Sequence, residues 1–382
     1  MSPPFSQMLC YDGRHLGANP HIILLGSSKV GNFVVSTPTI DALKARYPDS
    51  TIGFIGSEIT ADFEISYPSI DWRISWDLSG PDSFHTFTDA IIRNRNLFGP
   101  FDLAVNLDGF NPVTRVLCSL ISPSFVAGIS YDSNRHRLLN SPSDPVCELL
   151  NDPHWDNPEF ISRYSSFLSS NYIAEIFCVI ARVSSYSNPY NISLPSSSPP
   201  FVVPDVLIHC TTTRAAKIWS FSNWKIVVDY LVSSGFTVGI VGSEPCQQST
   251  IYNSGNSEQW LIDHTDLIDL RGRTSLMQLA GALSLSKAFL TVDAGPLHIS
   301  AAVGTLTLAV VGNDSTNTGA SPLRLWLPRV PNVHRTIASH SCSLCSDNRF
   351  QNDGCLVSDH PCMSSVTPNQ VIEWLNINLI HP

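Results

Sequence analysis

The stretch LTVDAGPLHISAAVG, residues 290–304, joins two apolar patterns through a short polar loop. Its first residues form an apolar run typical of a buried strand, and its last residues carry the Ala and Ser of a helix that packs closely on a sheet. Between them, AGP predicts free N–H groups at a helix N-terminus, and Pro296 suits the first turn because it has no N–H to leave unpaired. We therefore expect a βα unit with a seat for a phosphate where the helix begins.

The same alternation of strand and helix patterns extends along the chain in both directions. Strand patterns occupy residues 21–26, 51–56, 101–107, 124–130, 206–210, 236–242, 267–272, 288–293 and 305–312, and helical patterns occupy residues 30–48, 222–235 and 275–286. Strands that alternate with helices predict parallel sheets with helices on both faces. The fold class predicted here is therefore α/β.

The segment NPYNISLPSSSPPFVVP, residues 188–204, divides the chain into two halves. Its Pro and Ser content disfavours helix and sheet interiors, and the full length of 382 residues exceeds one ordinary core. We expect an N-terminal arm at residues 1–20, a domain at 21–188, a linker at 189–204 and a second domain at 205–368. Two doubly wound, Rossmann-like domains facing across a cleft would bind ligands at the carboxyl ends of their strands.

Composition excludes several classes of protein. The net charge of -10 argues against nucleic acid as a partner, because general binding to nucleic acid needs a cationic surface. No apolar run approaches the roughly 18 residues of a membrane span. At most peripheral membrane contact is expected. The first twenty residues lack the pattern of a secretory signal, so a cytoplasmic location is the default expectation.

Two side chains in the opening stretch are candidates for ligand binding. His298 lies in the first turn of the predicted helix and offers a donor, and Asp293 at the strand end can accept bonds from loop N–H groups or from ligand hydroxyls. The alternative is structural: Asp293 caps the helix and His298 is a hydrogen-bonded turn residue.

Four blocks of the sequence resemble one known family. VDAGPLHISAAVG (292–304) resembles the D-[ST]-G-[PM]-x-H signature of the ADP-heptose:lipopolysaccharide heptosyltransferases, glycosyltransferase family nine. KVGNFVVSTPTIDALKARYPDSTIGFIG (29–56), FDLAVNLDG (101–109) and VLIHCTTTRAAKIWSFSNW (206–224) resemble further blocks of that family, in the same order. The resemblance implies a GT-B fold and an inverting transfer of a sugar, usually from ADP-heptose, to a glycan or protein hydroxyl. It also implies that the C-terminal helix, residues 369–382, braces the N-terminal domain.

The resemblance also implies the residues that bind the nucleotide sugar. Lys217 would offset the charge of the leaving diphosphate, since a cation aimed at developing charge lowers the barrier. Its alternative is a solvated surface lysine. The residues implied to bind the nucleotide sugar are Thr211, Thr212, Thr213, Lys217, Asp293, Ala294, Gly295, Pro296 and His298. Segment 267–276 is expected to line the pocket of the base.

The general base of the family is an Asp at the position that Asn32 occupies here. An amide cannot take the acceptor's proton, so either the base has moved or the protein is inactive. Asp108, at the carboxyl end of a predicted strand, is the best replacement, with Asn32 orienting acceptor or donor. Its alternative is a loop-capping residue, and Asp41 lies further along the helix. No D-x-D sequence is present, and no cofactor is expected for catalysis.

The cysteines near the C-terminus form a separate candidate site. Cys342 and Cys345 make a C-x-x-C pair, and Cys355 and Cys362 follow closely. Four converging thiolates would hold a structural zinc or iron ion. Free or disulfide-paired thiols are the alternative. A subgroup of the family that glycosylates autotransporter proteins has an iron-binding version of this block.

The leading hypothesis is therefore a GT-B glycosyltransferase that uses ADP-heptose or a similar nucleotide sugar. One alternative is the same fold with another donor sugar. A second is a catalytically silent homologue that binds sugar nucleotide or acts as a scaffold, which Asn32 keeps open. A dinucleotide-binding oxidoreductase is disfavoured because no G-x-G-x-x-G follows the first predicted strand.

Overall fold

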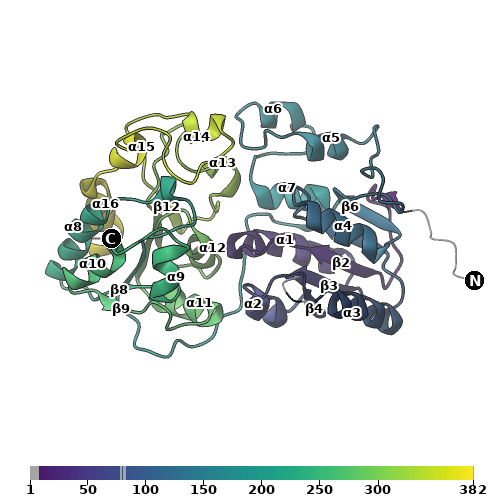
Figure 1. Cartoon of the computed structure of the whole chain (residues 1–382), viewed down its shortest axis with the longest axis horizontal. Helices are drawn as coiled ribbons and strands as arrows, with labels where there is room; N and C mark the ends of the chain where they lie inside the picture. The colour runs from purple at the N-terminus through teal and green to yellow at the C-terminus, as the bar shows by residue number, and fades with distance from the viewer. Residues whose placement is uncertain (1–7, 78–79, 81–82, 382) are drawn as a thin grey trace, which may run out of the picture. The chain divides into compact units, whose positions relative to one another are not determined.

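The computed structural model describes residues 8–77, 80 and 83–381, which form two α/β units (Figure 1). One unit ends at Ser193 and the other begins at Leu194. Each contains a six-stranded sheet whose neighbouring strands are all parallel. The α/β class with two Rossmann-like domains is therefore confirmed, and the cleft between them stays a prediction.

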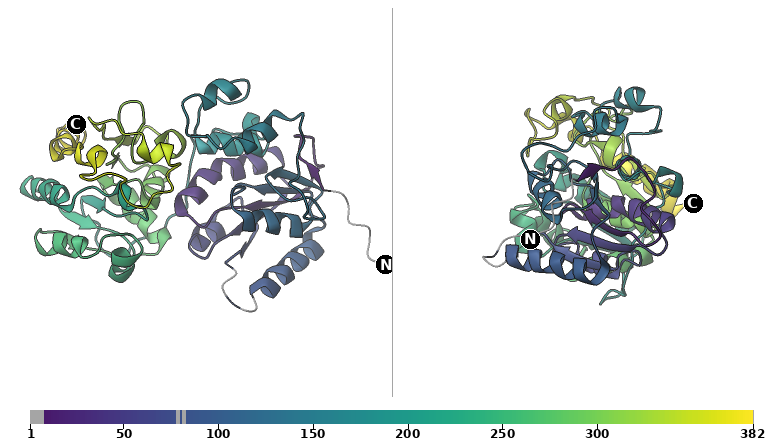
Figure 2. Two further views of the ribbon diagram at one scale, coloured as in Figure 1. Left: turned by 45° about the horizontal axis from the view of Figure 1, so that its top comes forward. Right: turned by 90° about the vertical axis from the view of Figure 1, so that its right-hand side faces the viewer.

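Unit 1 has the strand order β1-β6-β5-β2-β3-β4. Its elements are β1 (Leu9–Cys10), β2 (His21–Leu25), α1 (Val30–Arg46), β3 (Thr51–Gly56), α2 (Ala61–Ser66), β4 (Trp72–Ser75), α3 (Ser83–Phe98), β5 (Leu103–Asn106), α4 (Pro112–Ile121), β6 (Phe125–Gly128), α5 (Pro145–Asn151), α6 (Phe160–Tyr164), α7 (Ile173–Ile180) and the short helix η1 (Ser184–Tyr186). Every residue of β2 is buried, as expected for a strand covered on both faces. Figure 2 shows helices on both sides of each sheet.

Helix α1 continues through Pro38. A proline inside a helix costs free energy, because it removes one backbone hydrogen bond. Pro38 has no N–H to donate to the carbonyl of Val34, four residues earlier. The hydroxyl of Thr37 donates to that carbonyl instead, at 2.7 Å. The helix therefore runs unbroken from Val30 to Arg46, and it packs on the sheet through Phe33 and Phe54, whose rings lie 5.4 Å apart.

Unit 2 has the strand order β12-β11-β10-β7-β8-β9. Its elements are β7 (Val206–His209), η2 (Ala215–Lys217), α8 (Phe221–Ser233), β8 (Val238–Ile240), α9 (Pro245–Thr250), α10 (Ser257–Asp263), β9 (Ile268–Asp269), α11 (Leu276–Leu285), β10 (Ala288–Thr291), α12 (Gly295–Ala302), β11 (Thr307–Ala309), α13 (Leu323–Trp326), β12 (Val333–Arg335), α14 (Leu344–Asp347), α15 (Pro361–Ser364), α16 (Pro368–Leu375) and a π-helical turn η3 (Asn376–Ile380). Helices α8 and α16 pack on one face of the sheet, whereas α12 packs on the other.

The main core of unit 2 is built around two tryptophans. Trp219 and Trp224 are fully buried and meet edge to face with 5.1 Å between ring centroids. The indole N–H of Trp219 donates to the backbone oxygen of Val366 at 2.8 Å, so its one polar atom is satisfied. This contact fixes the chain just after the loop that carries Lys217.

The ends of the predicted domains differ from expectation in places. Residues 8–20, expected as a loose arm, include β1, which pairs with β6. Met8, just before β1, is buried in the core. Residues 1–7 lie outside the described residues. Residues 189–204 contain no helix or strand. In this linker, Ser197 donates its N–H to Met277 of α11. Helix α16 packs against α8 of unit 2. Its predicted contact with the N-terminal domain stays a prediction.

None of the helices in the described part of the chain combines the length and the apolar character that crossing a bilayer requires.

Candidate functional site

Unit 2 reverses its strand order at β7, which has β8 on one side and β10 on the other. Ligands of doubly wound sheets bind outside the carboxyl ends of the strands at such a point. Here Lys217, from the loop after β7, reaches Asp293, which follows β10. The Lys217 ammonium donates to the backbone oxygen of Asp293 at 2.7 Å and to its carboxylate Oδ2 at 3.2 Å. The two predicted residues are thus brought together at the expected place.

The electrostatics of this pair favour an ionised carboxylate. Burial opposes ionisation of Asp293, but Lys217, His298 and a hydrogen bond from Ser321 outweigh it, and the pKa of Asp293 lies below its usual value. His298 is buried, and burial lowers its pKa to about 4. The imidazole is therefore neutral at pH 7. Its Nδ1 atom is buried and has no hydrogen-bond partner in the structure.

Helix α12 begins beside this pair with the predicted small residues. Ala294 is its N-cap, and Gly295 and Pro296 open the first turn. Alanine has no side chain that can cap a helix, Pro296 has no N–H, and the N–H of Leu297 donates to the backbone oxygen of Ala294 at 3.0 Å. The N–H of Gly295 is therefore the group of the first turn that a further acceptor can use. Asp293 pairs with Lys217 rather than capping the helix. The arrangement joins a helix N-terminus, a lysine ammonium and a neutral histidine, which suits a bound phosphate.

The three threonines after β7 differ in their surroundings. Thr211 is fully buried, and its hydroxyl oxygen accepts a bond from the amide of Gln248 at 3.1 Å. Thr212 is buried and Thr213 is exposed. The backbone oxygens of Thr212 and Thr213 both accept bonds from the amide of Asn253. The loop is therefore held from the α9 side, and Thr213 offers the one solvent-facing hydroxyl of the three.

Sequence reasoning missed a buried polar network beneath this loop. Gln248 also donates to Glu258 at 3.1 Å, and Glu258 pairs with Arg271, which in turn pairs with Asp269. Burial raises the pKa of Glu258 to about 7, although Arg271 acts in the opposite direction. These residues come from α9, α10 and the end of β9, and no local pattern connects them. Helix α10 has the mixed sequence SEQWLID, so nothing local marks Glu258 as buried.

The segment after β9, expected to line the pocket of the base, does lie beside the loop after β8. Gly272 donates its N–H to the backbone oxygen of Gly242 at 2.9 Å. A Cβ atom at Gly272 would lie 2.5 Å from the carboxyl carbon of Glu244, and its φ of +67° is in the left-handed region. Glycine therefore lets the Glu244 carboxylate lie close to this turn.

Unit 1 reverses its strand order between β2 and β5, and the predicted residues of this unit follow those strands. Lys29 is the N-cap of α1, and Asn32 lies in the first helical turn. Asp108 follows β5 and accepts a bond from the amide of Asn111 at 3.0 Å. Burial raises the pKa of Asp108, and Asn111 and the positive charge of Lys29 oppose the rise. The loops after β2 and β5 thus face each other.

Asp41 has a structural environment instead. Its carboxylate accepts hydrogen bonds from Tyr67 and Ser69, each at 2.8 Å. Both oxygens are therefore engaged in fixing α1 to the chain after α2. That Asp41 lies apart from the chemistry stays a prediction.

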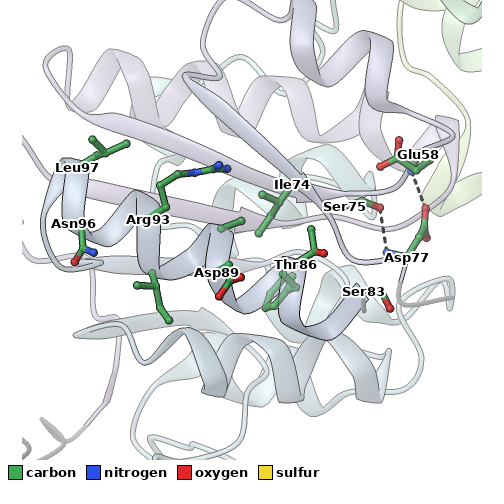
Figure 3. A pocket seen from close by; sticks show the side chains of 13 residues that line it. Glu58, Ile74, Ser75, Asp77, Ser83, Thr86, Asp89, Arg93, Asn96 and Leu97 are labelled. Atoms are coloured by element: carbon green, nitrogen blue, oxygen red, sulfur yellow. Dashed lines mark hydrogen bonds between the residues drawn. The ribbon is translucent and has the colours of Figure 1, made fainter. Parts of the chain in front are cut away.

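A pocket of about 980 Å³ opens beside the edge strand β4 and contains none of the predicted site residues (Figure 3). Its wall combines carboxylates with apolar side chains of α3. Asp77 accepts a bond from the backbone N–H of Glu58 at 2.7 Å, and its own N–H donates to Ser75. The Asp77 carboxylate of this rim is thus tied to the backbone of Glu58, and both residues follow the carboxyl ends of β3 and β4.

The four C-terminal cysteines are all free thiols, and Cys345 and Cys362 are buried. Burial raises the pKa of Cys362 to about 11, and the thiols of Cys342, Cys345 and Cys355 add to the rise. Within residues 8–77, 80 and 83–381, however, no three His, Cys, Asp or Glu side chains are placed as a metal-binding group.

Comparison with known sequences identifies the C-terminal half. Residues 191–343 match the family model of glycosyltransferase family 9 (heptosyltransferase), a stretch that contains Lys217, Asp293 and His298. The chain carries a glycosyltransferase family 9 domain. The predicted resemblance and the assignment as a glycosyltransferase are therefore confirmed. No curated protein sequence matches this glycosyltransferase.

Solved structures share the fold of this glycosyltransferase over nearly its whole length. A family 9 glycosyl transferase from Veillonella parvula has 15% identity and a TM-score of 0.71, with 97% of this chain and 100% of that chain covered. The E. coli heptosyltransferase WaaC with ADP has 14% identity and a TM-score of 0.60, covering 94% and 99%. The iron-containing dodecameric glycosyltransferase TibC from enterotoxigenic E. coli has 16% identity and a TM-score of 0.56, covering 95% and 77%. At these identities the likeness concerns the fold, which is GT-B.

Proposed function

We propose that this glycosyltransferase moves a heptose or related sugar from ADP-heptose, or a similar nucleotide sugar, to a hydroxyl of a saccharide or protein. The single observation that carries the proposal is the Lys217–Asp293 pair at the strand-order reversal of unit 2, beside the N-terminus of α12. A diphosphate bound there would meet a cation, the N–H of Gly295 and neutral His298. The structures of WaaC with ADP and of TibC with ADP-D-beta-D-heptose support this choice of donor.

The proposed reaction proceeds with inversion at the anomeric carbon. The acceptor oxygen forms its bond to that carbon while the bond to the diphosphate oxygen breaks, and ADP leaves with both electrons of that bond. Lys217 has three N–H donors, two of which contact Asp293, so one is left for the leaving phosphate. Groups that face developing charge in this way stabilise the transition state.

We assign the general base to Asp108. Its carboxylate is partly buried, keeps one oxygen clear of the Asn111 bond and sits at the strand-order reversal of unit 1. Asn32, which replaces the expected aspartate, is assigned to orient the acceptor or the donor. The proton of the acceptor hydroxyl would move to Asp108 as the new bond forms.

The decisive experiment compares Asp108→Ala with Asp49→Ala, a control at an exposed turn of the same unit. We expect Asp108→Ala to abolish sugar transfer from ADP-heptose while ADP affinity stays nearly intact, and Asp49→Ala to behave like the wild type. Restoration of transfer by Asn32→Asp in the Asp108→Ala background would further support the assignment. An unchanged rate of transfer in Asp108→Ala would contradict the assignment of Asp108 as the general base.

A second candidate function is a catalytically silent protein that binds sugar nucleotide or acts as a scaffold in glycan assembly. Asn32 favours this candidate, because an amide cannot serve as the base. The test is to measure ADP binding and ADP-heptose turnover in the same wild-type preparation. Binding without hydrolysis or transfer would favour the silent protein over the enzyme.

We also propose that Cys342, Cys345, Cys355 and Cys362 hold a structural zinc or iron ion. The C-x-x-C spacing of Cys342 and Cys345, the short intervals to Cys355 and Cys362, and the iron content of the TibC structure support this proposal. Four thiolates suit either metal, and a bound ion would fix the shape of the segment. The metal content of purified protein should fall in Cys342→Ser and stay unchanged in Cys246→Ser, an exposed cysteine elsewhere in unit 2. Equal metal content in the two variants would contradict the site.

The proposed place of action is the cytoplasm, as expected from the sequence. The acceptor is proposed only by class, as a glycan or protein hydroxyl.

A further inference from the structure

The loop that carries Lys217 is held by the Cys-rich segment, far away in the sequence. Ala216, the residue before Lys217, is buried, and its N–H donates to the backbone oxygen of Asp353 at 2.7 Å. Its carbonyl oxygen lies 2.7 Å from Nε2 of His360. A carbonyl can only accept, so Nε2 carries the hydrogen and donates. Both backbone polar groups of Ala216 are thus bound by one distant segment.

Arg214 adds a third connection between the same two segments. Its Nε donates to the backbone oxygen of Asn352 at 2.9 Å, and its guanidinium lies 5.7 Å from the centre of the Phe350 ring. A further bond runs from Nη1 to the backbone oxygen of Ala320 at 3.1 Å. The short helix η2 is therefore held at two points, by Arg214 just before it and by Ala216 within it.

The segment that supplies these contacts has an unusual backbone. Phe350 and His360 have φ values of +55° and +46°, and their neighbours Arg349 and Asp359 have +51° and +69°. Residues other than glycine pay a cost in this left-handed region, and surrounding contacts must hold them there. The strained pairs lie at the two ends of the stretch that holds η2, where Phe350 meets Arg214 and His360 meets Ala216.

We propose that His360 and Arg214 are positioning residues that hold Lys217 in register with Asp293 for sugar transfer. Neither residue is assigned a contact with the substrate. The inference rests on the proposed function, because that function gives Lys217 its role. The Cys-rich segment then also has a role, because its fold fixes the backbone from which the Lys217 ammonium reaches across the strand ends.

The physical reason for an effect on rate is geometric. The Lys217 ammonium contacts Asp293 at the end of a long flexible side chain. Its position therefore depends on the position of the Lys217 backbone. Ala216 fixes that starting point through two hydrogen bonds, one of which His360 supplies. Misplacement by about 1 Å can reduce a rate by up to about 100-fold while binding is largely kept.

The test uses the full-length protein with His360→Ala, His360→Gln and the control His340→Ala, an exposed histidine nearby. With ADP-heptose as donor, we expect kcat to fall about tenfold in His360→Ala while the affinity for ADP changes less than about twofold. Glutamine carries an amide N–H that can donate to Ala216, so His360→Gln should recover most of kcat. His340→Ala should match the wild type.

A second measurement is independent of activity. Hydrogen exchange at the amides of Lys217 and Ile218, which bond to Arg214 and Ala215, should become faster in His360→Ala and in Arg214→Ala, whereas exchange in β10 should not change. If the wild type transfers no sugar, the proposed function fails while this measurement still tests the positioning. Unchanged exchange, unchanged kcat in His360→Ala, or a Gln variant as slow as the Ala variant would overturn the inference.

Discussion

The ammonium of Lys217 lies 2.7 Å from the backbone oxygen of Asp293 and 3.2 Å from its carboxylate, which joins the loops after β7 and β10. The Lys217 and Asp293 side chains are only 14% and 9% exposed, so solvent screens this pair weakly. The contact therefore has two consequences: it keeps Asp293 ionised, and it holds a cation where a diphosphate would lie.

Replacing Lys217 should impair both activity and stability. Lys217→Ala removes the cation proposed to face the leaving group, and we expect kcat to fall roughly 100- to 1,000-fold. It also leaves Asp293 buried without its partner, at a cost of about 3–5 kcal/mol in the free energy of unfolding. Steady-state transfer and urea unfolding measure the two effects.

The control for this prediction is Lys225→Ala. Lys225 pairs with Asp229 one helical turn away on the surface of α8, where such pairs contribute about 0.3–0.5 kcal/mol. We expect nearly unchanged activity and stability for this variant. A Lys217→Ala protein with wild-type kcat would contradict the proposed role of Lys217.

The pH dependence of transfer should report Asp108. Burial raises the pKa of this carboxyl, and Lys29 opposes the rise. A base works only when deprotonated, so kcat should increase with pH through the pKa of Asp108. Lys29→Met should move the acid limb of the profile to higher pH, and Lys29→Arg should leave it in place. An acid limb that stays in place in Lys29→Met would show that the ionisation of Asp108 does not control the rate.

His209 should make the protein less stable as the pH falls. Burial lowers its pKa to about 4, below the ordinary value near 6.5. As the pH falls from 6.5 to 4, the His209 imidazole therefore binds a proton in the unfolded chain but not in the folded chain. The free energy of unfolding decreases by up to roughly 3 kcal/mol as a result.

Glu258 acts in the opposite direction, because its pKa is raised to about 7 and the folded chain takes up that proton first. The measurement that isolates His209 is the difference in unfolding free energy between the wild type and His209→Gln at several pH values. That difference should change between pH 6.5 and 4 and stay constant above pH 7.5. A constant difference throughout would show that His209 is not buried in its neutral form.

Gly281→Ala should destabilise unit 2, although alanine is the better helix former by about 1 kcal/mol at an exposed position. Gly281 lies in α11, and a Cβ atom there would be 1.9 Å from the backbone oxygen of Ser197 in the linker. We expect a lower unfolding midpoint and faster hydrogen exchange at the Ser197 amide, which bonds to Met277. A stabilised variant would mean that the linker does not lie on this helix in solution.

Much of the fold could be predicted from the sequence because buried parallel strands are short, continuous apolar runs. The strand β4 and helix α3 escaped prediction. In β4 the apolar run is interrupted by Arg73, which the structure places against the fully buried carboxylate of Glu64 at 2.8 Å. A charged residue inside a strand hides the pattern, and only the tertiary contact explains it.

The site could be predicted in part for a similar reason. Lys217, Asp293 and His298 stand next to strand ends, where the pattern itself points to ligand binding. The residues that hold them could not be predicted, since Gln248 reaches Thr211 and His360 reaches Ala216 across large distances in the sequence. Whether a histidine is charged also depends on burial, as the low pKa of His298 illustrates.

The strand orders of the two sheets correspond position by position, so the polypeptide is an internal duplication in topology. β2 corresponds to β7 and β5 to β10, and the sixth place is filled by the first strand, β1, in one copy and by the last strand, β12, in the other. The copies also place a lysine after the first of these strands and an aspartate after the second: Lys29 with Asp108, and Lys217 with Asp293. Lys217 and Asp293 form an ion pair, whereas Lys29 acts on Asp108 only through its charge. In the proposed reaction Lys217 would face the leaving group and Asp108 the acceptor, so the two copies would use this shared placement for different roles.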